Sequence, residues 1–152
     1  MFEKIKTWLT SQSVEFREVH HEPTTTSEES ARVRGVDLSI GGKALVLKIG
    51  DDFKICVLSA AKKLDSEALK KYFGVKKLRF ADKEELMSLT DLVPGSVPPF
   101  GRPIIDLDLF VDNSIVNNEQ IAFNAGSLTD SIIMSVPDYL KVTKPTVLDF
   151  SE

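Results

Sequence analysis

Two β-rich runs joined by a short turn constrain the fold of this chain most strongly. Residues 43–49 (KALVLKI) and 53–59 (FKICVLS) are rich in aliphatic and β-branched side chains, and Gly50-Asp51-Asp52 joins them. Runs of this kind around a short Gly/Asp turn form a β-hairpin, so the two strands are antiparallel. The chain is therefore not expected to be a regular alternation of parallel strands and helices.

Helical signals lie on both sides of the hairpin. Apolar residues recur at helical spacing in the first dozen residues, which read as an amphipathic helix. Helix start signals stand at Thr26, Asp65 and Asp82, and those at Thr26 and Asp82 have a glutamate three residues later. The expected helices are therefore 1–12, 27–34, 65–74 and 82–89, with a last short helix that begins at Pro137.

The remaining β-rich runs complete the expected architecture. Further strands are expected at 14–19, 78–80, 104–107, 121–124 and 131–136, and the tail after Lys144 is expected to be irregular. A length of 152 residues favours one domain over 1–152. The mixed order predicts an α+β fold: one curved, mixed but mostly antiparallel sheet or partial barrel, with helices packed outside.

The sequence carries no targeting or crosslinking signal. No apolar run approaches the ~18 residues of a membrane helix, and the N-terminal MFEKIKTWLT has no apolar signal-peptide core. The single cysteine, Cys56, excludes an internal disulfide and lies in an apolar alternation, so it is expected in the core. We therefore expect a cytoplasmic protein with no membrane partner.

Charge is distributed unevenly along the chain. The net charge is −4, but residues 62–79 hold seven basic and two acidic residues, so this window is +5 and the rest of the chain is −9. Such a window is either a solvated lysine-rich surface or a face that holds a phosphate backbone, and charge alone favours the first. The basic residues are Lys62, Lys63, Lys70, Lys71, Lys76, Lys77 and Arg79.

Three groups of polar residues are candidate chemical sites. Gly41-Gly42-Lys43 lacks the spacing of a phosphate-binding loop, and the residues alone favour a strand-end lysine with its head in water. His20-His21 would point to opposite faces of a strand, and zinc needs at least three ligands, so no metal site is expected. Asp106 and Asp108 fit charged turn residues better than an acid–base pair.

The segment DLVPGSVPPFG, residues 91–101, is the stiffest part of the chain. It holds three prolines and two glycines, and its one charged residue stands at its edge. Prolines fix φ, and glycine adopts angles closed to other residues. Such a loop can present backbone N–H groups to a carbonyl or carboxylate without any reactive side chain. It can equally be a rigid connector, and the residues alone leave both readings open.

Four segments in their order and spacing resemble a known family. GGKALVLKIGDD, DLVPGSVPPFG, IIDLDLF and AFNAGSLTDSIIM are similar to the YbaK family of aminoacyl-tRNA deacylases, whose domain is also the editing domain of bacterial prolyl-tRNA synthetases. The resemblance extends from about His20 to Leu140. It implies a mixed α/β fold with a barrel-like sheet. It also implies hydrolysis of the ester between a wrongly attached amino acid and the 3′-terminal adenosine of tRNA.

The resemblance also implies roles for residues. It makes Lys43 the anchor for the terminal phosphate or ribose, and Gly95 the glycine of a loop whose N–H groups stabilise the oxyanion. Water activated by a ribose hydroxyl of the substrate would attack, with no metal, cofactor or covalent intermediate. Because both histidines lie early in the chain, a histidine-assisted mechanism is not expected. The substrate-binding residues implied are Ser96, Val97, Pro98 and Pro99 in the loop, and Asn124, Ala125, Gly126 and Ser127 at a strand end.

The function predicted from the sequence is therefore a trans-editing aminoacyl-tRNA deacylase. Its partners would be aminoacylated tRNA and an aminoacyl-tRNA synthetase, and the lysines of residues 62–77 would contact the tRNA acceptor stem. The alternative is a non-catalytic module of the same fold that binds tRNA or another nucleic acid, chiefly through this basic window.

Overall fold

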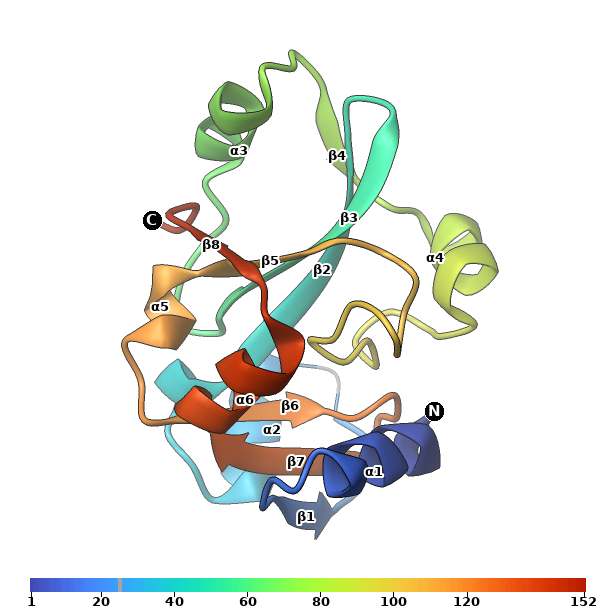
Figure 1. Ribbon diagram of the computed structural model, residues 1–152, viewed down its shortest axis with the longest axis vertical. Helices are drawn as coiled ribbons and strands as arrows, with labels where there is room; N and C mark the ends of the chain where they lie inside the picture. Colours follow the sequence, from blue (N-terminus) through green and yellow to red (C-terminus); the bar gives the residue numbers. More distant parts are fainter. Residues whose placement is uncertain (25) are drawn as a thin grey trace.

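The computed structural model describes residues 1–24 and 26–152. It contains two β-sheets, and each is assembled from distant parts of the chain (Figure 1). The smaller sheet has the strand order β1-β7-β6, and the larger has the order β4-β2-β3-β5-β8. The strands are β1 (Arg17–His20), β2 (Gly42–Ile49), β3 (Asp52–Ser59), β4 (Leu78–Phe80), β5 (Leu109–Asp112), β6 (Gln120–Asn124), β7 (Asp130–Ser135) and β8 (Thr146–Leu148).

The predicted hairpin is confirmed along its whole length. β2 and β3 pair antiparallel from Gly42 opposite Ser59 to Ile49 opposite Asp52. β1/β7, β6/β7 and β2/β4 are also antiparallel, whereas β3/β5 and β5/β8 are parallel. The α+β, mostly antiparallel fold is thus confirmed, but the strands form two sheets rather than one and do not close into a barrel.

The sheets meet at the glycines that precede Lys43. A parallel bridge joins Gly41 to Ala122 on β6. A Cβ on Gly42 would stand 2.8 Å from the Ile121 side chain, closer than real side chains approach. Glycine therefore lets β2 begin directly against β6, and this contact places the start of β2 between the two sheets.

The predicted helix signals are confirmed. Thr26 and Asp65 accept hydrogen bonds from backbone N–H groups three residues later, and Asp82 forms a complete capping box with Glu85. The helices are α1 (Phe2–Ser11), α2 (Ser27–Arg34), the 3-10 helix η1 (Leu38–Ile40), α3 (Ser66–Phe73), α4 (Lys83–Thr90), α5 (Asn113–Val116) and α6 (Val136–Thr143).

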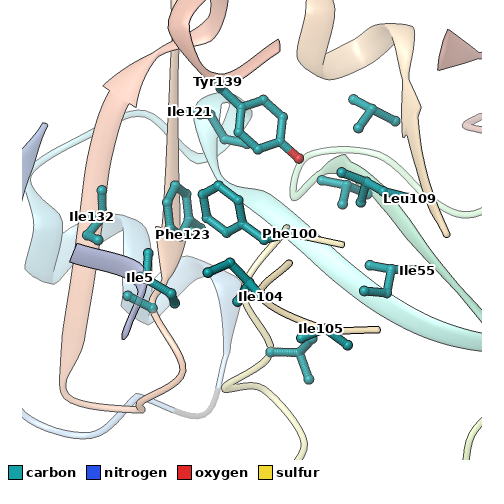
Figure 2. Packing of buried hydrophobic residues seen from close by; sticks show 14 of the residues in the cluster. Ile5, Ile55, Phe100, Ile104, Ile105, Leu109, Ile121, Phe123, Ile132 and Tyr139 are labelled. Atoms are coloured by element: carbon teal, nitrogen blue, oxygen red, sulfur yellow. The ribbon is translucent and has the colours of Figure 1, made fainter. Parts of the chain in front are cut away.

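Aromatic rings fill the core between the sheets. Figure 2 shows Phe123 of β6, Tyr139 of α6 and Phe100 of the stiff loop packed together, with Ile5 of α1 nearby. The Phe100 ring contacts Phe123 and Tyr139 edge-on, with ring centroids 5.2 and 5.7 Å apart. Phe100 is wholly buried, so the loop that carries it is a structural part of the core.

Two predicted segments differ in the structure. Residues 104–107 form a turn rather than a strand, because the N–H groups of Ile104 and Ile105 both donate to the Gly101 carbonyl oxygen. The apolar residues of this segment reflect burial rather than a strand, since Ile104 and Ile105 both lie in the core. The tail is not irregular: β8 pairs in parallel with β5. β8 is a strand through its pairing with β5, which lies far away in the sequence.

Within residues 1–24 and 26–152, no helix has the length and apolarity that a membrane crossing requires. Cys56 lies in the core as predicted, and burial raises the pKa of its thiol to about 12.

Candidate functional site

A pocket of about 180 Å³ lies where the two sheets meet. Its wall comes from α2, the start of β2, the end of β6 and the stiff loop. Lys43, Gly95 and Asn124, three residues that the sequence singled out from distant segments, all line this one pocket. Val97 joins them, and hydroxyl side chains cover the side formed by α2 and the segment before it.

Lys43 stands at the mouth of the pocket, at the start of β2. Its Nζ donates a hydrogen bond to the Lys62 carbonyl oxygen at 2.8 Å, which fixes the side chain. Burial lowers the pKa of Lys43, and the charge of Glu28 opposes this effect. Lys43 is therefore not a freely solvated strand-end lysine but a positioned cation.

The stiff loop turns sharply at Gly95, where φ is +86°. The Ser96 hydroxyl and N–H both donate to the Val93 carbonyl oxygen, at 2.8 and 3.2 Å, so the Ser96 N–H closes the turn. In the part of the chain that the structure describes, the N–H groups of Gly95 and Val97 make no hydrogen bond. Two donors of the loop, rather than all of them, are thus free beside the pocket.

The rest of the loop is buried behind the pocket. Ser96, Pro98 and Pro99 do not line it. Pro98 and Pro99 have no N–H to donate, and the Pro99 carbonyl oxygen accepts a 2.6 Å hydrogen bond from the Tyr139 hydroxyl in the core. These residues therefore lie outside the described lining of the pocket and help to hold the shape of the loop.

Asn124 connects β6 to the loop. Its Nδ2 donates to the Gly95 carbonyl oxygen at 2.7 Å, so the side chain holds the loop at its turn. The next three residues leave the pocket. Ala125 is wholly buried, Gly126 lies against Met1, and Ser127 donates to Asp130 at 2.8 Å within the β6–β7 turn. Of the predicted strand-end group, only Asn124 lines the pocket.

Arg34, the last residue of α2, is a pocket residue that the sequence analysis missed. Its guanidinium donates through Nε to Ser131 Oγ and through Nη2 to Asn124 Oδ1, both at 2.9 Å. Burial lowers the pKa of Arg34 to about 10. A signal was present: Ser30 and Arg34 are four residues apart and Ala31 lies beside them, so one face of this short helix points inward.

His21, a candidate metal ligand in the sequence, belongs to the hydrogen-bond network of Arg34 and Ser131. Its Nδ1 lies 2.8 Å from the Glu22 carbonyl oxygen and its Nε2 lies 2.8 Å from Ser131 Oγ. Since a carbonyl oxygen only accepts, Nδ1 carries a proton and donates to Glu22. His21 thus orients Ser131 behind Arg34 and does not itself line the pocket.

The described lining residues of the pocket include no carboxylate, histidine or cysteine. The hydroxyls of Thr24 and Ser30 bond to each other at 2.7 Å and are buried. The lining therefore offers two cations, two free backbone N–H groups and several hydroxyls. It can bind anions and carbonyl oxygens, but it supplies no side chain that would act as a general base at neutral pH.

The basic window lies outside this pocket. The lysines of residues 62–77 sit between β3 and β4, on α3 and the loops around it, and most are exposed. Lys70 pairs with Glu67 at 3.0 Å, and Arg79 makes two hydrogen bonds to Glu85 at 2.7 and 2.9 Å. Among the described residues, the window is linked to the pocket by the Lys62 carbonyl oxygen, which accepts a hydrogen bond from Lys43.

The other polar groups have structural partners. His20 Nδ1 lies 2.6 Å from Asp130, away from His21. Arg102 pairs with both Asp106 and Asp108, at 2.7 and 2.6 Å, so these aspartates are charged turn residues as predicted. Among residues 1–24 and 26–152, no cluster of three or more His, Cys, Asp or Glu could hold a metal ion.

The pocket carries two cations and free backbone N–H donors, so it suits a ligand that has an anionic group and a carbonyl oxygen. The family model described as the aminoacyl-tRNA editing domain matches residues 21–142, and the chain belongs to that family. The prediction of an aminoacyl-tRNA deacylase that hydrolyses mischarged tRNA is thereby confirmed, and the non-catalytic alternative is not favoured.

Curated relatives and solved structures agree with this membership. The chain is 32% identical to the Escherichia coli (strain K12) multifunctional Ser/Thr-tRNA deacylase ProXp-y over 93% of this chain and 87% of that protein. It is 26% identical to a proline–tRNA ligase of Macrococcus caseolyticus over 70% of this chain, which spans only 18% of the ligase.

Two crystal structures share the fold. The hypothetical protein APE2540 matches with a TM-score of 0.87 and 25% identity over 98% of this chain and 99% of that one. A candidate trans-editing enzyme for prolyl tRNA synthetase matches with a TM-score of 0.80 and 24% identity over 90% and 87% of the two chains. These likenesses show that both structures share the overall fold of this chain.

Proposed function

We propose that this protein removes serine or threonine from tRNA to which either has been wrongly attached. The single observation that carries the site is the convergence of Lys43, the Gly95 loop and Asn124 on one pocket. The name of the Escherichia coli relative supports the choice of amino acid. Hydroxyl side chains of α2 and the preceding segment line the same pocket and suit a substrate hydroxyl.

The free N–H groups of Gly95 and Val97 would hold the substrate carbonyl and stabilise the oxyanion that forms on attack by water. The Asn124 side chain supports this role because it holds the Gly95 carbonyl oxygen at 2.7 Å and so fixes the turn. Lys43 would bind the terminal nucleotide as a cation. Since the described lining offers no base, a ribose hydroxyl of the substrate would activate the water, without a metal.

The protein would act in trans in the cytoplasm, on tRNA released by a synthetase. The 32% identity to the Ser/Thr-tRNA deacylase supports an action on aminoacylated tRNA. The exposed lysines of residues 62–77 would contact the acceptor stem, because a basic face attracts the phosphate backbone. The link from Lys43 to the Lys62 backbone connects that face to the pocket.

Deacylation of a substrate panel tests the proposal. Purified protein with EDTA is mixed with tRNAs carrying serine, threonine, alanine or proline, and wild type is compared with Lys43→Ala. We expect loss of the serine and threonine esters, with kcat/KM at least about tenfold lower in Lys43→Ala, because a hydrogen bond from a charged group is lost.

Lys48→Ala is a matched control, since Lys48 lies on the same strand but does not line the pocket. A Lys43→Ala enzyme with full activity would contradict the assigned site. Activity that disappears with EDTA and returns with a metal ion would contradict the metal-independent mechanism.

A further inference from the structure

Arg34 is a buried cation without an acidic partner. Only 9% of the residue is exposed, and both of its hydrogen-bond partners, Ser131 and Asn124, are neutral. No salt bridge joins Arg34 to an acidic residue in the described part of the chain. Arginine stays charged in proteins, and an uncompensated buried charge is destabilising. The position therefore suits a residue whose counter-charge arrives with a ligand.

One nitrogen of the guanidinium is left for that ligand. Nε and Nη2 are used by Ser131 and Asn124, whereas Nη1 has no hydrogen-bond partner in residues 1–24 and 26–152. Nη1 lies 3.8 Å from the point where a Cβ on Gly41 would stand. Gly41 has no side chain and lies two residues before Lys43, and Arg34, Gly41 and Lys43 all line the pocket.

The charges of the pocket specify the ligand class. Arg34 and Lys43 both line it, and no described lining residue is acidic. Burial lowers the pKa of both groups. Two cations in one pocket favour an anion that offers two oxygens, and guanidinium and ammonium groups both bind phosphate well.

We propose that Arg34, through Nη1, binds together with Lys43 the phosphodiester that links the last two nucleotides of the tRNA. This inference rests on the proposed function, in which the pocket receives the 3′ end of aminoacyl-tRNA. That phosphate is the permanent negative charge nearest to the ester in such a substrate. Arg34 is thus a substrate-binding residue, and its bonds to Ser131 and Asn124 hold Nη1 in place.

A pair of dinucleotides isolates the phosphate charge. Cytidylyl-(3′→5′)-adenosine (CpA) has the terminal phosphodiester, and its methylphosphonate analogue keeps both nucleosides but is uncharged. Binding of each is measured by NMR titration of isotope-labelled protein, with no turnover involved. Wild type is expected to bind CpA at least about tenfold more tightly than the analogue, since charged hydrogen bonds are lost with the analogue.

Four variants assign the preference to residues. Arg34→Gln should reduce the preference for CpA at least about threefold, and Arg34→Lys should retain part of it. Lys43→Ala should also leave a part, which Arg34 supplies. Arg32→Gln is the matched control, because Arg32 is an exposed arginine of the same helix. Circular dichroism melting checks that each variant folds.

Three results would overturn the proposal. They are equal binding of CpA and its analogue by wild type, an equal loss of both ligands in Arg34→Gln, or complete loss of the preference in Lys43→Ala. The last result decides the question even where Arg34→Gln does not fold. A protein that prefers CpA but hydrolyses no aminoacyl-tRNA would contradict the proposed function alone, so the two failures are distinguishable.

Discussion

Replacement of Tyr139 by phenylalanine tests whether the core holds the stiff loop, residues 91–101, in shape. The Tyr139 ring is wholly buried, and its hydroxyl donates to the Pro99 carbonyl oxygen at 2.6 Å. Burial raises the pKa of this hydroxyl, so it stays protonated and remains a donor. Phenylalanine keeps the ring contact with Phe100 and removes only the donor.

The expected cost follows from the buried carbonyl that loses its partner. An unsatisfied buried polar group costs about 1–3 kcal/mol. For a chain of this length each kcal/mol lowers Tm by about 2–4 °C, so Tyr139→Phe should melt roughly 2–12 °C below wild type. Pro99 lies four residues after Gly95. Because the loop is stiff, release of its buried end should also lower kcat for ester hydrolysis.

Thermal denaturation followed by circular dichroism measures the first effect, and deacylation at saturating substrate measures the second. Tyr72→Phe is the matched control, since Tyr72 is the other tyrosine and is 57% exposed. If Tyr139→Phe and Tyr72→Phe melt within about 1 °C of each other, corresponding to less than ~0.5 kcal/mol, the reasoning is refuted. Unchanged kcat in a destabilised variant would refute the link to the loop.

Two further predictions concern a backbone angle and a buried carboxylate. Gly95→Ala should lower kcat more than stability, because φ of +86° costs a residue with a Cβ about 1–2 kcal/mol and the loop would relax; steady-state kinetics beside urea denaturation checks this. Asp112 is buried; burial alone would raise its pKa, but hydrogen bonds from Ser114, Phe150 and Ser151 outweigh it and hold the pKa below the ordinary value of 3.8. A carboxylate with a lowered folded pKa stabilises the protein above its unfolded pKa and loses this contribution as pH falls through the folded value. The stability gap between wild type and Asp112→Asn should therefore narrow below about pH 4, and a gap that is constant from pH 7 to pH 2 in urea denaturation would contradict this.

Local elements of the fold could be predicted from the sequence because their causes are local. The β2–β3 hairpin depends on two neighbouring runs and the turn between them. The ends of α2 and α3 depend on caps within three residues and on glycines at φ of +71° and +65°. In contrast, β8 pairs with β5, which lies more than thirty residues earlier, and no local sequence pattern indicates such a partner.

The candidate site shows the same difference between residues with local signals and residues placed by long-range contacts. Lys43 and Gly95 could be proposed from motifs, and the pocket contains both. Arg34 has only the weak signal of its spacing from Ser30, because a polar residue at a helix end is usually solvated. Its hydrogen bonds to Asn124 of β6 and Ser131 of β7 are visible only in the tertiary structure. Residues 125–127, which were predicted to bind the substrate, lie outside the pocket because β6 ends at Asn124 and the chain turns there.

The sequence alone determined the elements whose stability comes from neighbours in the chain, and through motif resemblance it determined the family. Only the tertiary structure decided that the strands divide into two sheets, and that Arg34 and His21 belong to the site. It also decided which loop N–H groups are free. The physical reason is that burial and hydrogen-bond satisfaction depend on residues far apart in sequence, and chain order does not record which of them will meet.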